Sequence, residues 1–104
     1  MVHYIIVKFI NNFNYLERTK EITDLFNEAL KIDGISKINI YTSNSKLSNR
    51  HDLMIKMNLT ARALKEFDNS WIHRKWKDEY GKYIENKTIF DSEWFLDMLS
   101  KVIE

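Results

Sequence analysis

The chain has 104 residues, with 16 Lys and Arg against 15 Asp and Glu, so its formal net charge is only +1. A charge this small gives no field to hold a nucleic-acid backbone or an anionic membrane, and we expect neither as a partner. Cysteine is absent, which excludes disulfides and thiolate metal sites and fits a reducing compartment, predicted to be the cytoplasm. The composition, 44% hydrophobic and 30% charged, is typical of one folded globular domain.

The first part of the chain predicts a strand, a helix and a second strand. Residues 2–10 are almost continuously apolar and rich in β-branched side chains, which indicates a strand covered on both faces. Asn14 is predicted to cap the helix, with Glu17 three positions later, and Gly34 to end it. Residues 35–42 change to a period of two, which predicts the second strand. Apolar side chains recur at helical spacing between the cap and the glycine: Leu16, Ile22, Phe26, Ala29 and Leu30.

The middle of the chain predicts a hairpin followed by two helices. Residues 43–50 are rich in Ser and Asn and indicate a loop. Thr60 is predicted to cap a short helix, and Ser70 to cap a second helix that runs as far as Ile84. Between the loop and the first of these helices lies a third strand, whose apolar residues share one face: Leu53, Ile55, Met57 and Leu59.

The last part of the chain completes a recognisable order of elements. Residues 86–91 predict a fourth strand, and the residues after Ser92 predict a short amphipathic helix. The resulting order is that of an α+β, ferredoxin-like βαββαβ fold, in which helices cover one face of a four-stranded antiparallel sheet. We therefore expect one domain over residues 1–93 and a C-terminal helical extension over residues 94–104.

The uncovered face of such a sheet predicts self-association. The even-numbered side of the first strand carries Tyr4, Ile6 and Ile10, and the third strand adds Met54. Isolated monomers rarely leave apolar patches of this kind in water. We therefore expect two copies to close sheet against sheet in a homodimer, which is a dimeric α/β barrel.

Two stretches of sequence carry a family resemblance. They are VHYIIVKF near the start and HDLMIKMNLTARALKEFDNSWIHRKWKDEYGKYIENKTIFD further on. Together they resemble the Dabb family, the stress-responsive dimeric alpha/beta-barrel domains, over about residues 1–93. The resemblance implies a homodimer whose two sheets face each other, in a family most of whose members have no established activity. The most telling pieces are His3, the Leu64 to Phe67 turn, the spacing from His73 to Tyr80, and the closing Ile89, Phe90 and Asp91.

A few plant members of this family are polyketide cyclases, which hold a linear polyketide between sheet and helices and use a His and a Tyr for aldol chemistry. The resemblance implies that His73 matches the catalytic His of those cyclases and that His3 matches their strand-one His. Where they carry the catalytic Tyr, this chain has Phe67, which has no hydroxyl to move a proton. Where many members show His-Pro-x-His, residues 70–73 are Ser-Trp-Ile-His.

The predicted site centres on His73. If Ser70 is the cap, His73 lies in the first helical turn, where the positive end of the helix dipole disfavours a protonated ring. A neutral imidazole facing the sheet can act as a general base, or it can be a structural histidine with its hydrogen bonds satisfied, and the sequence leaves both open. The candidate catalytic residues are His73, His3 and Tyr80, and the candidate ligand-binding residues are Val7, Phe9, Phe67, Trp71 and Trp76.

Three functions are compatible with these residues. The first is binding of a small, mostly apolar or aromatic ligand in a pocket between sheet and helices, without a cofactor. The second is a cofactor-free enzyme of the cyclase or isomerase kind, in which His73 takes a proton next to a carbonyl while Tyr80 or His3 orients the substrate. The third is a haem- or oxygen-handling monooxygenase of the related dimeric barrel type, although its strand-one Asn cannot be placed. No carboxylate or third His falls at ligand spacing, so no metal is expected.

Overall fold

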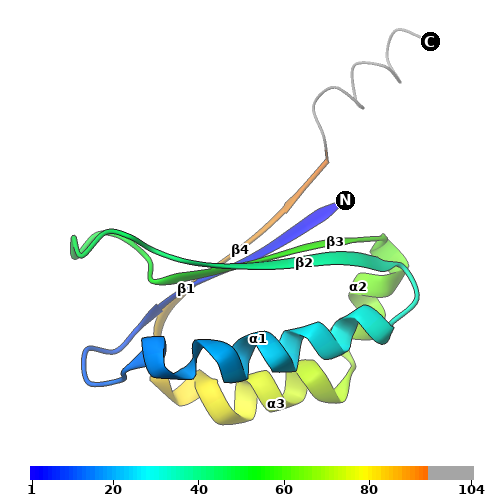
Figure 1. The fold of residues 1–104 in the computed structure, drawn as a ribbon. Coiled ribbons are helices and arrows are strands. Elements are labelled where there is room, and N and C mark those ends of the chain that lie inside the picture. The colour runs from blue at the N-terminus through cyan, green and yellow to red at the C-terminus, as the bar shows by residue number, and fades with distance from the viewer. Residues whose placement is uncertain (94–104) are drawn as a thin grey trace, which may run out of the picture.

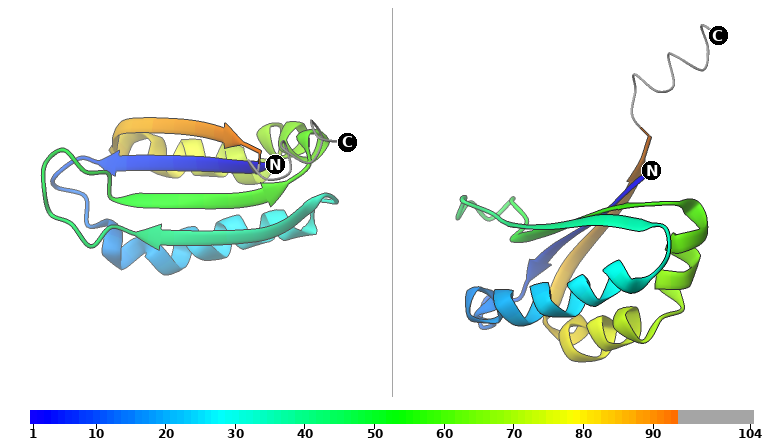
Figure 2. Two further views of the ribbon diagram at one scale, coloured as in Figure 1. Left: turned by 90° about the horizontal axis from the view of Figure 1, so that it is seen from above. Right: turned by 45° about the vertical axis from the view of Figure 1, so that its right-hand side comes forward.

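The structure, a computed structural model, describes residues 1–93 (Figure 1). Its strands lie in one antiparallel sheet in the order β2-β3-β1-β4, and its helices cover one face of that sheet (Figures 1 and 2). The predicted βαββαβ order and ferredoxin-like fold are therefore confirmed. The elements are β1 (Val2–Phe9), α1 (Thr19–Asn27), β2 (Ile35–Thr42), β3 (Leu53–Leu59), α2 (Ala61–Asp68), α3 (Trp71–Tyr80) and β4 (Ile84–Ser92), with 3₁₀ turns over Tyr15–Arg18, Glu28–Lys31 and Gly81–Tyr83.

One predicted side-chain cap and one predicted helix boundary were wrong. The side chain of Asn14 makes no capping hydrogen bond, and a 3₁₀ turn precedes α1. Ile84 is not the last turn of α3 but the first residue of β4, where it pairs with Phe9 of β1. Its spacing from Tyr80 fits a helix as well as a strand boundary, and the pairing across the sheet decides between them.

Two side-chain caps and one glycine were predicted correctly. The Thr60 hydroxyl accepts a hydrogen bond from the Ala63 amide at 3.1 Å, and the Ser70 hydroxyl accepts one from the His73 amide at 3.3 Å. Gly34 has a φ of +95°, which glycine adopts at little cost. A Cβ added there would lie 2.7 Å from the Thr60 hydroxyl oxygen, so the turn and the α2 cap are packed against each other.

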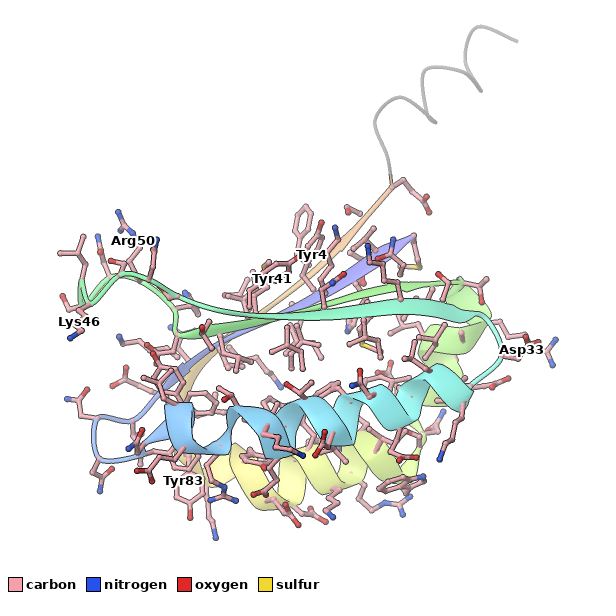
Figure 3. The ribbon with its side chains drawn as sticks, in the orientation of Figure 1. Tyr4, Asp33, Tyr41, Lys46, Arg50 and Tyr83 are labelled. Atoms are coloured by element: carbon pink, nitrogen blue, oxygen red, sulfur yellow. The ribbon has the colours of Figure 1, made fainter. Side chains whose placement is uncertain are left out.

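The sheet has two unlike faces because side chains alternate along each strand. Odd-numbered residues of β1 and β3 face the helices and form the buried core. On the opposite face, Tyr4 pairs with Phe90 and their rings lie 6.1 Å apart. Phe90 is 58% exposed and Tyr41 46% exposed. Figure 3 shows Tyr4 and Tyr41 pointing away from the helices, on what we call the open face, defined by Tyr4, Ile6, Tyr41, Met54 and Phe90.

No helix within residues 1–93 is long and apolar enough to cross a membrane. The helix predicted for residues 94–104, and with it the division of the chain at residue 93, lies outside the described residues.

Candidate functional site

A histidine and a carboxylate meet on the helix-facing side of the sheet. His3 of β1 and Asp91 of β4 are cross-strand partners, and Nδ1 of His3 lies 2.5 Å from Oδ1 of Asp91. The His3 side chain is only 8% exposed, whereas that of Asp91 is 44% exposed. Asp91 therefore fixes the orientation of the ring from the solvent side, and within residues 1–93 no hydrogen bond reaches Nε2. An imidazole held at Nδ1 by a carboxylate presents Nε2 for proton transfer or ligand binding.

Sequence reasoning did not assign Asp91 a role in the site. It lies 88 residues from His3 along the chain, and only the strand register brings the two together. Its single signal in the sequence was its place in the closing Ile-Phe-Asp of the family resemblance. A carboxylate at that position becomes informative only once β4 is known to pair with β1.

His73 lies in the first turn of α3, as predicted, with partners of its own. Its Nδ1 is 3.1 Å from the carbonyl oxygen of Asp68, and its ring centroid is 5.3 Å from that of Phe67. Burial lowers the pKa of His73 below its usual value, while the hydrogen bond to the Asp68 carbonyl opposes this shift and the charge of Lys87 adds to it. The ring is therefore held neutral near pH 7, as the sequence predicted, but chiefly through desolvation.

Alternate side chains of β4 face the helices beside His3. Lys87, whose charge acts on His73, pairs with Val7 and faces the helices, as Asp91 does beside His3. Four residues of strand correspond to about 13 Å at the usual rise per residue. Between Lys87 and Asp91, Ile89 is an exposed apolar side chain on the same side of β4. We call Lys87, Ile89 and Asp91 the β4 strip. His3 of β1 lies beside the Asp91 end of this strip, whereas His73 of α3 has a separate hydrogen-bond partner in the Asp68 carbonyl.

The predicted ligand-binding residues fall into two groups. Four of them, with Tyr80, are at most 3% exposed and belong to the packed core: Val7, Phe9, Phe67 and Trp76. The fifth, Trp71, is 53% exposed and does not lie between sheet and helices. It lines a groove of about 520 Å³ between α1 and α3, whose other lining residues are mostly charged. A ligand among the four core residues would have to displace side chains already in contact.

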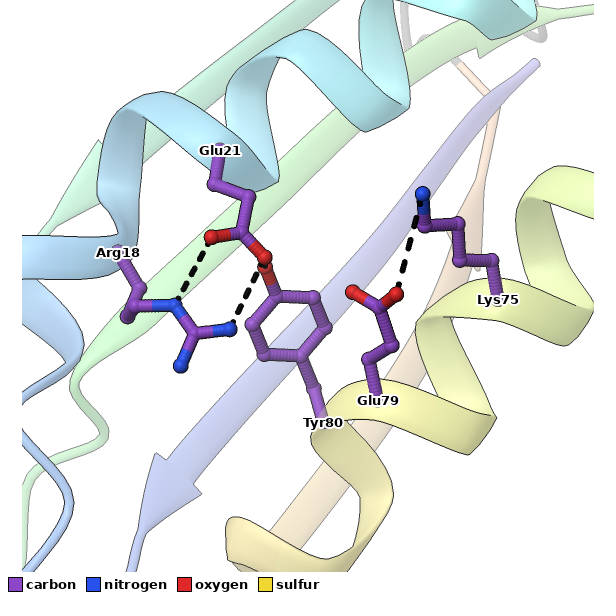
Figure 4. A network of polar contacts seen from close by, with 5 residues as sticks. All are labelled: Arg18, Glu21, Lys75, Glu79 and Tyr80. Carbon is purple, nitrogen blue, oxygen red and sulfur yellow. Dashed lines mark hydrogen bonds and ion pairs between the residues drawn. The ribbon is translucent and has the colours of Figure 1, made fainter.

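Tyr80 is engaged between the helices rather than free to orient a substrate (Figure 4). Its hydroxyl donates to Oε1 of Glu21 at 2.5 Å, and Arg18 donates to both oxygens of the same carboxylate, at 3.0 and 2.9 Å. These bonds, first from Arg18 and then from Tyr80, lower the pKa of Glu21 to about 2. Burial, followed by the bond to Glu21, raises the pKa of Tyr80. The network ties α3 to the start of α1.

Replacing Tyr80 by phenylalanine should lower the free energy of unfolding by about 1–2 kcal/mol at pH 7, because Glu21 loses a donor. Glu21 has a folded pKa below its ordinary 4.5, so its contribution is present above pH 4.5 and is lost as the pH falls toward 2. The Tyr80→Phe variant should therefore lose less stability than the wild type between these two pH values. Urea denaturation at pH 7 and pH 3 measures both effects. Tyr83→Phe is the control, and an equal loss in both variants would contradict the role of the network.

Within residues 1–93 no group of three or more His, Asp or Glu side chains converges in a way that could hold a metal ion.

Comparisons with known proteins support the fold. No protein-family model matches the sequence, and no curated protein matches it significantly. A dimeric ferredoxin-like protein of unknown function from Jannaschia sp. CCS1 superposes with a TM-score of 0.74 at 14% identity, covering 89% of this chain and 97% of that chain. An Arabidopsis thaliana protein superposes with a TM-score of 0.72 at 11% identity, covering 89% of this chain and 93% of its own. A Dabb family protein with a ferredoxin-like fold from Mesorhizobium loti gives 0.68 at 14% identity, with 90% and 95% covered.

At such low sequence identities, it is the TM-scores that establish a shared architecture. The resemblance to the Dabb family that the sequence indicated therefore extends to the whole described fold, and the chain has the ferredoxin-like fold of a Dabb family protein and of proteins described as dimeric.

Proposed function

We propose that this protein is a homodimer that binds a small, mostly apolar ligand between its sheet and its helices, where His3 of β1 meets Asp91 on the β4 strip. The observation that carries the proposal is the His3–Asp91 pair. A nearly buried imidazole, oriented by a carboxylate and with Nε2 unpaired within residues 1–93, is a polar anchor beside an apolar core. The exposed Ile89 extends the same strip with apolar surface. No metal or redox cofactor is needed for such binding.

The homodimer in this proposal uses the open face. That face exposes aromatic side chains at Tyr41 and Phe90, and water-exposed patches of this kind are typical of interfaces. Proteins of the same fold from Bacteroides fragilis, Thermobifida fusca and Jannaschia sp. CCS1 are described as dimeric. The dimer would leave the helix-facing strip outside the interface, because alternate side chains of a strand point to opposite faces of the sheet.

The ligand site is tested with carbonyl compounds of simple structure. Acetophenone or 2-nonanone at about ten times its Kd should stabilise the protein by about 1.4 kcal/mol and raise Tm by roughly 6–7 °C. His3→Ala and Asp91→Asn should each remove most of this rise in Tm. The first variant lacks the imidazole that anchors the ligand, and the second lacks the carboxylate that orients the imidazole. Asp33→Asn, at the exposed turn labelled in Figure 3, is the matched control and should keep it. Equal shifts in all four proteins would refute the assignment.

A second candidate function is cofactor-free proton abstraction next to a carbonyl. The observation that favours it is the lowered pKa of His73, which keeps that imidazole able to accept a proton near pH 7. His3 of β1, held by Asp91, supplies a second polar group on the helix-facing side of the sheet, whereas Tyr80 is occupied by Glu21. Exchange of the α-hydrogens of 2-nonanone in D₂O, followed by NMR, detects the reaction without knowledge of the natural substrate. Exchange at the same rate in His73→Ala would exclude His73 as the base.

A further inference from the structure

A cavity lies at the end of β1 opposite to His3. It has a volume of about 740 Å³ and is formed where the hairpin between β2 and β3 lies over the segment that follows β1, at the left of Figure 1. Its lining includes Phe9, Phe13 and Tyr15 below and Lys46 above. Phe9 is six residues from His3, or about 20 Å along the strand. The volume lies within the range of about 300–1,000 Å³ that is usual for small-molecule sites.

One wall of this cavity is aromatic. The ring of Tyr15 stacks on that of Phe9 with centroids 5.4 Å apart and planes inclined by 22°, and Phe13 lies 5.0 Å from Phe9. Phe13 is held in turn by stacking on Tyr83 at 4.2 Å. Because these rings hold one another in place, they form a preformed apolar surface for a flat ligand. Binding therefore costs little conformational entropy of the protein side chains.

Four charged side chains also line the cavity: Lys8, Lys46, Asp52 and Glu85. Their charges sum to zero, yet none of the four takes part in the ion pairs found within residues 1–93. By contrast, the charged side chains on α1 pair with their neighbours one turn away, as Lys20 does with Asp24 at 2.7 Å. Lys8 donates to the carbonyl oxygen of Arg50 at 3.3 Å. Lys46, Asp52 and Glu85, which have no ionic partner within residues 1–93, are complementary to a ligand that carries both signs.

The carboxylate of Asp52 is fixed beside the aromatic wall of the cavity. Its Oδ2 accepts a hydrogen bond from the Phe9 amide at 2.8 Å, which sets its orientation. Burial, and then the charge of Asp52, raise the pKa of Tyr15, so the phenol keeps its proton beside the carboxylate. Lys46 lies on the exposed hairpin across the cavity, as labelled in Figure 3. The negative group is therefore held against β1, and the positive group lies on the hairpin.

We propose that this cavity binds an aromatic zwitterion, of the chemical class of the aromatic α-amino acids. The ring would lie against Phe13 and Tyr15, which the buried Phe9 ring supports from behind; the ammonium would meet Asp52, and the carboxylate would meet Lys46. This site is separate from the β4 strip, and neither depends on the other.

Calorimetric titration with L-phenylalanine, L-tyrosine and L-tryptophan tests the proposal. At least one should bind with a Kd below about 1 mM, and the matching analogue without the amine or without the carboxylate, such as 3-phenylpropionate or 2-phenylethylamine, should bind at least about tenfold more weakly. Lys46→Ala should weaken binding of the amino acid and of 3-phenylpropionate but not binding of 2-phenylethylamine. Asp52→Asn keeps an acceptor for the Phe9 amide. It should weaken binding of the amino acid and of 2-phenylethylamine but not binding of 3-phenylpropionate.

Lys65→Ala, an exposed lysine on α2, is the control and should bind like the wild type. Backbone amide shifts in ¹⁵N NMR should be largest near Asn11 and Ser45, which border the cavity. The proposal is overturned if none of the three amino acids binds at 10 mM, if a singly charged analogue binds as tightly as its amino acid, or if Lys46→Ala and Asp52→Asn both bind unchanged.

Discussion

Replacing Trp76 by alanine should lower the free energy of unfolding by about 3–5 kcal/mol, because it empties the space between α3 and α1. Trp76 is 2% exposed, and its indole lies 5.1 Å from the ring of Phe26 and 5.2 Å from that of Tyr80. Small domains are usually stable by about 5–15 kcal/mol in total. The Trp76→Ala variant should therefore unfold at much lower urea concentration than the wild type.

Trp71→Ala on the same helix is the matched control. Both changes remove an indole from α3, but Trp71 is largely exposed on the groove between the helices. Its loss should cost less than about 1 kcal/mol, since little apolar area returns to water. Urea denaturation followed by circular dichroism compares the two variants with the wild type. Similar losses in both would mean that the two indoles are not buried to the different extents described.

The comparison also separates two roles that the sequence could not distinguish. Both tryptophans were predicted to line a ligand pocket because both lie near His73 in an aromatic-rich stretch. Helical geometry instead places Ile72, Trp76 and Tyr80, at intervals of four, on the buried face and leaves Trp71 outside. A residue's distance along the chain from a candidate histidine therefore carries less information than its angular position on the helix.

The elements of the fold were largely predictable because their signals are local. The alternation in β3 and the caps at Thr60 and Ser70 depend on residues a few positions apart, and all of them are confirmed. Ile84 was assigned wrongly because its local pattern suits two structures, and its pairing with Phe9 involves a strand at the other end of the chain. Propensity gives way to tertiary pairing at such boundaries.

The polar part of the candidate site was harder to predict than the fold. The His3–Asp91 pair depends on the register of two strands separated by most of the chain, and a shift of one residue would turn Asp91 to the open face. The bond between Tyr80 and Glu21 likewise joins residues 59 positions apart. In neither pair are the two residues at a sequence spacing that predicts a contact between them. Chemical pairs of this kind become visible only when register and helix packing are known.

The double substitution Tyr41→Glu and Phe90→Glu should convert the proposed dimer into a monomer. Both side chains lie on the open face and are 46% and 58% exposed, so the change leaves the monomer core intact. In a face-to-face dimer, however, each subunit would bring two carboxylates into the interface, where unpaired charges are costly. We expect the dimer Kd to rise by at least about 1,000-fold, which corresponds to about 4 kcal/mol. Sedimentation velocity at micromolar concentration measures the change.

The matched control is Leu16→Glu with Leu30→Glu, on the segments that flank α1. These residues are 59% and 45% exposed, so the control adds the same charge at nearly the same exposure, but on the helix layer instead of the open face. It should sediment as a dimer, like the wild type. If the wild type is already a monomer at micromolar concentration, or if both double variants dissociate alike, the open face is not the interface. Added charge alone would then explain any dissociation, and the aromatic side chains of β2 and β4 would need another partner.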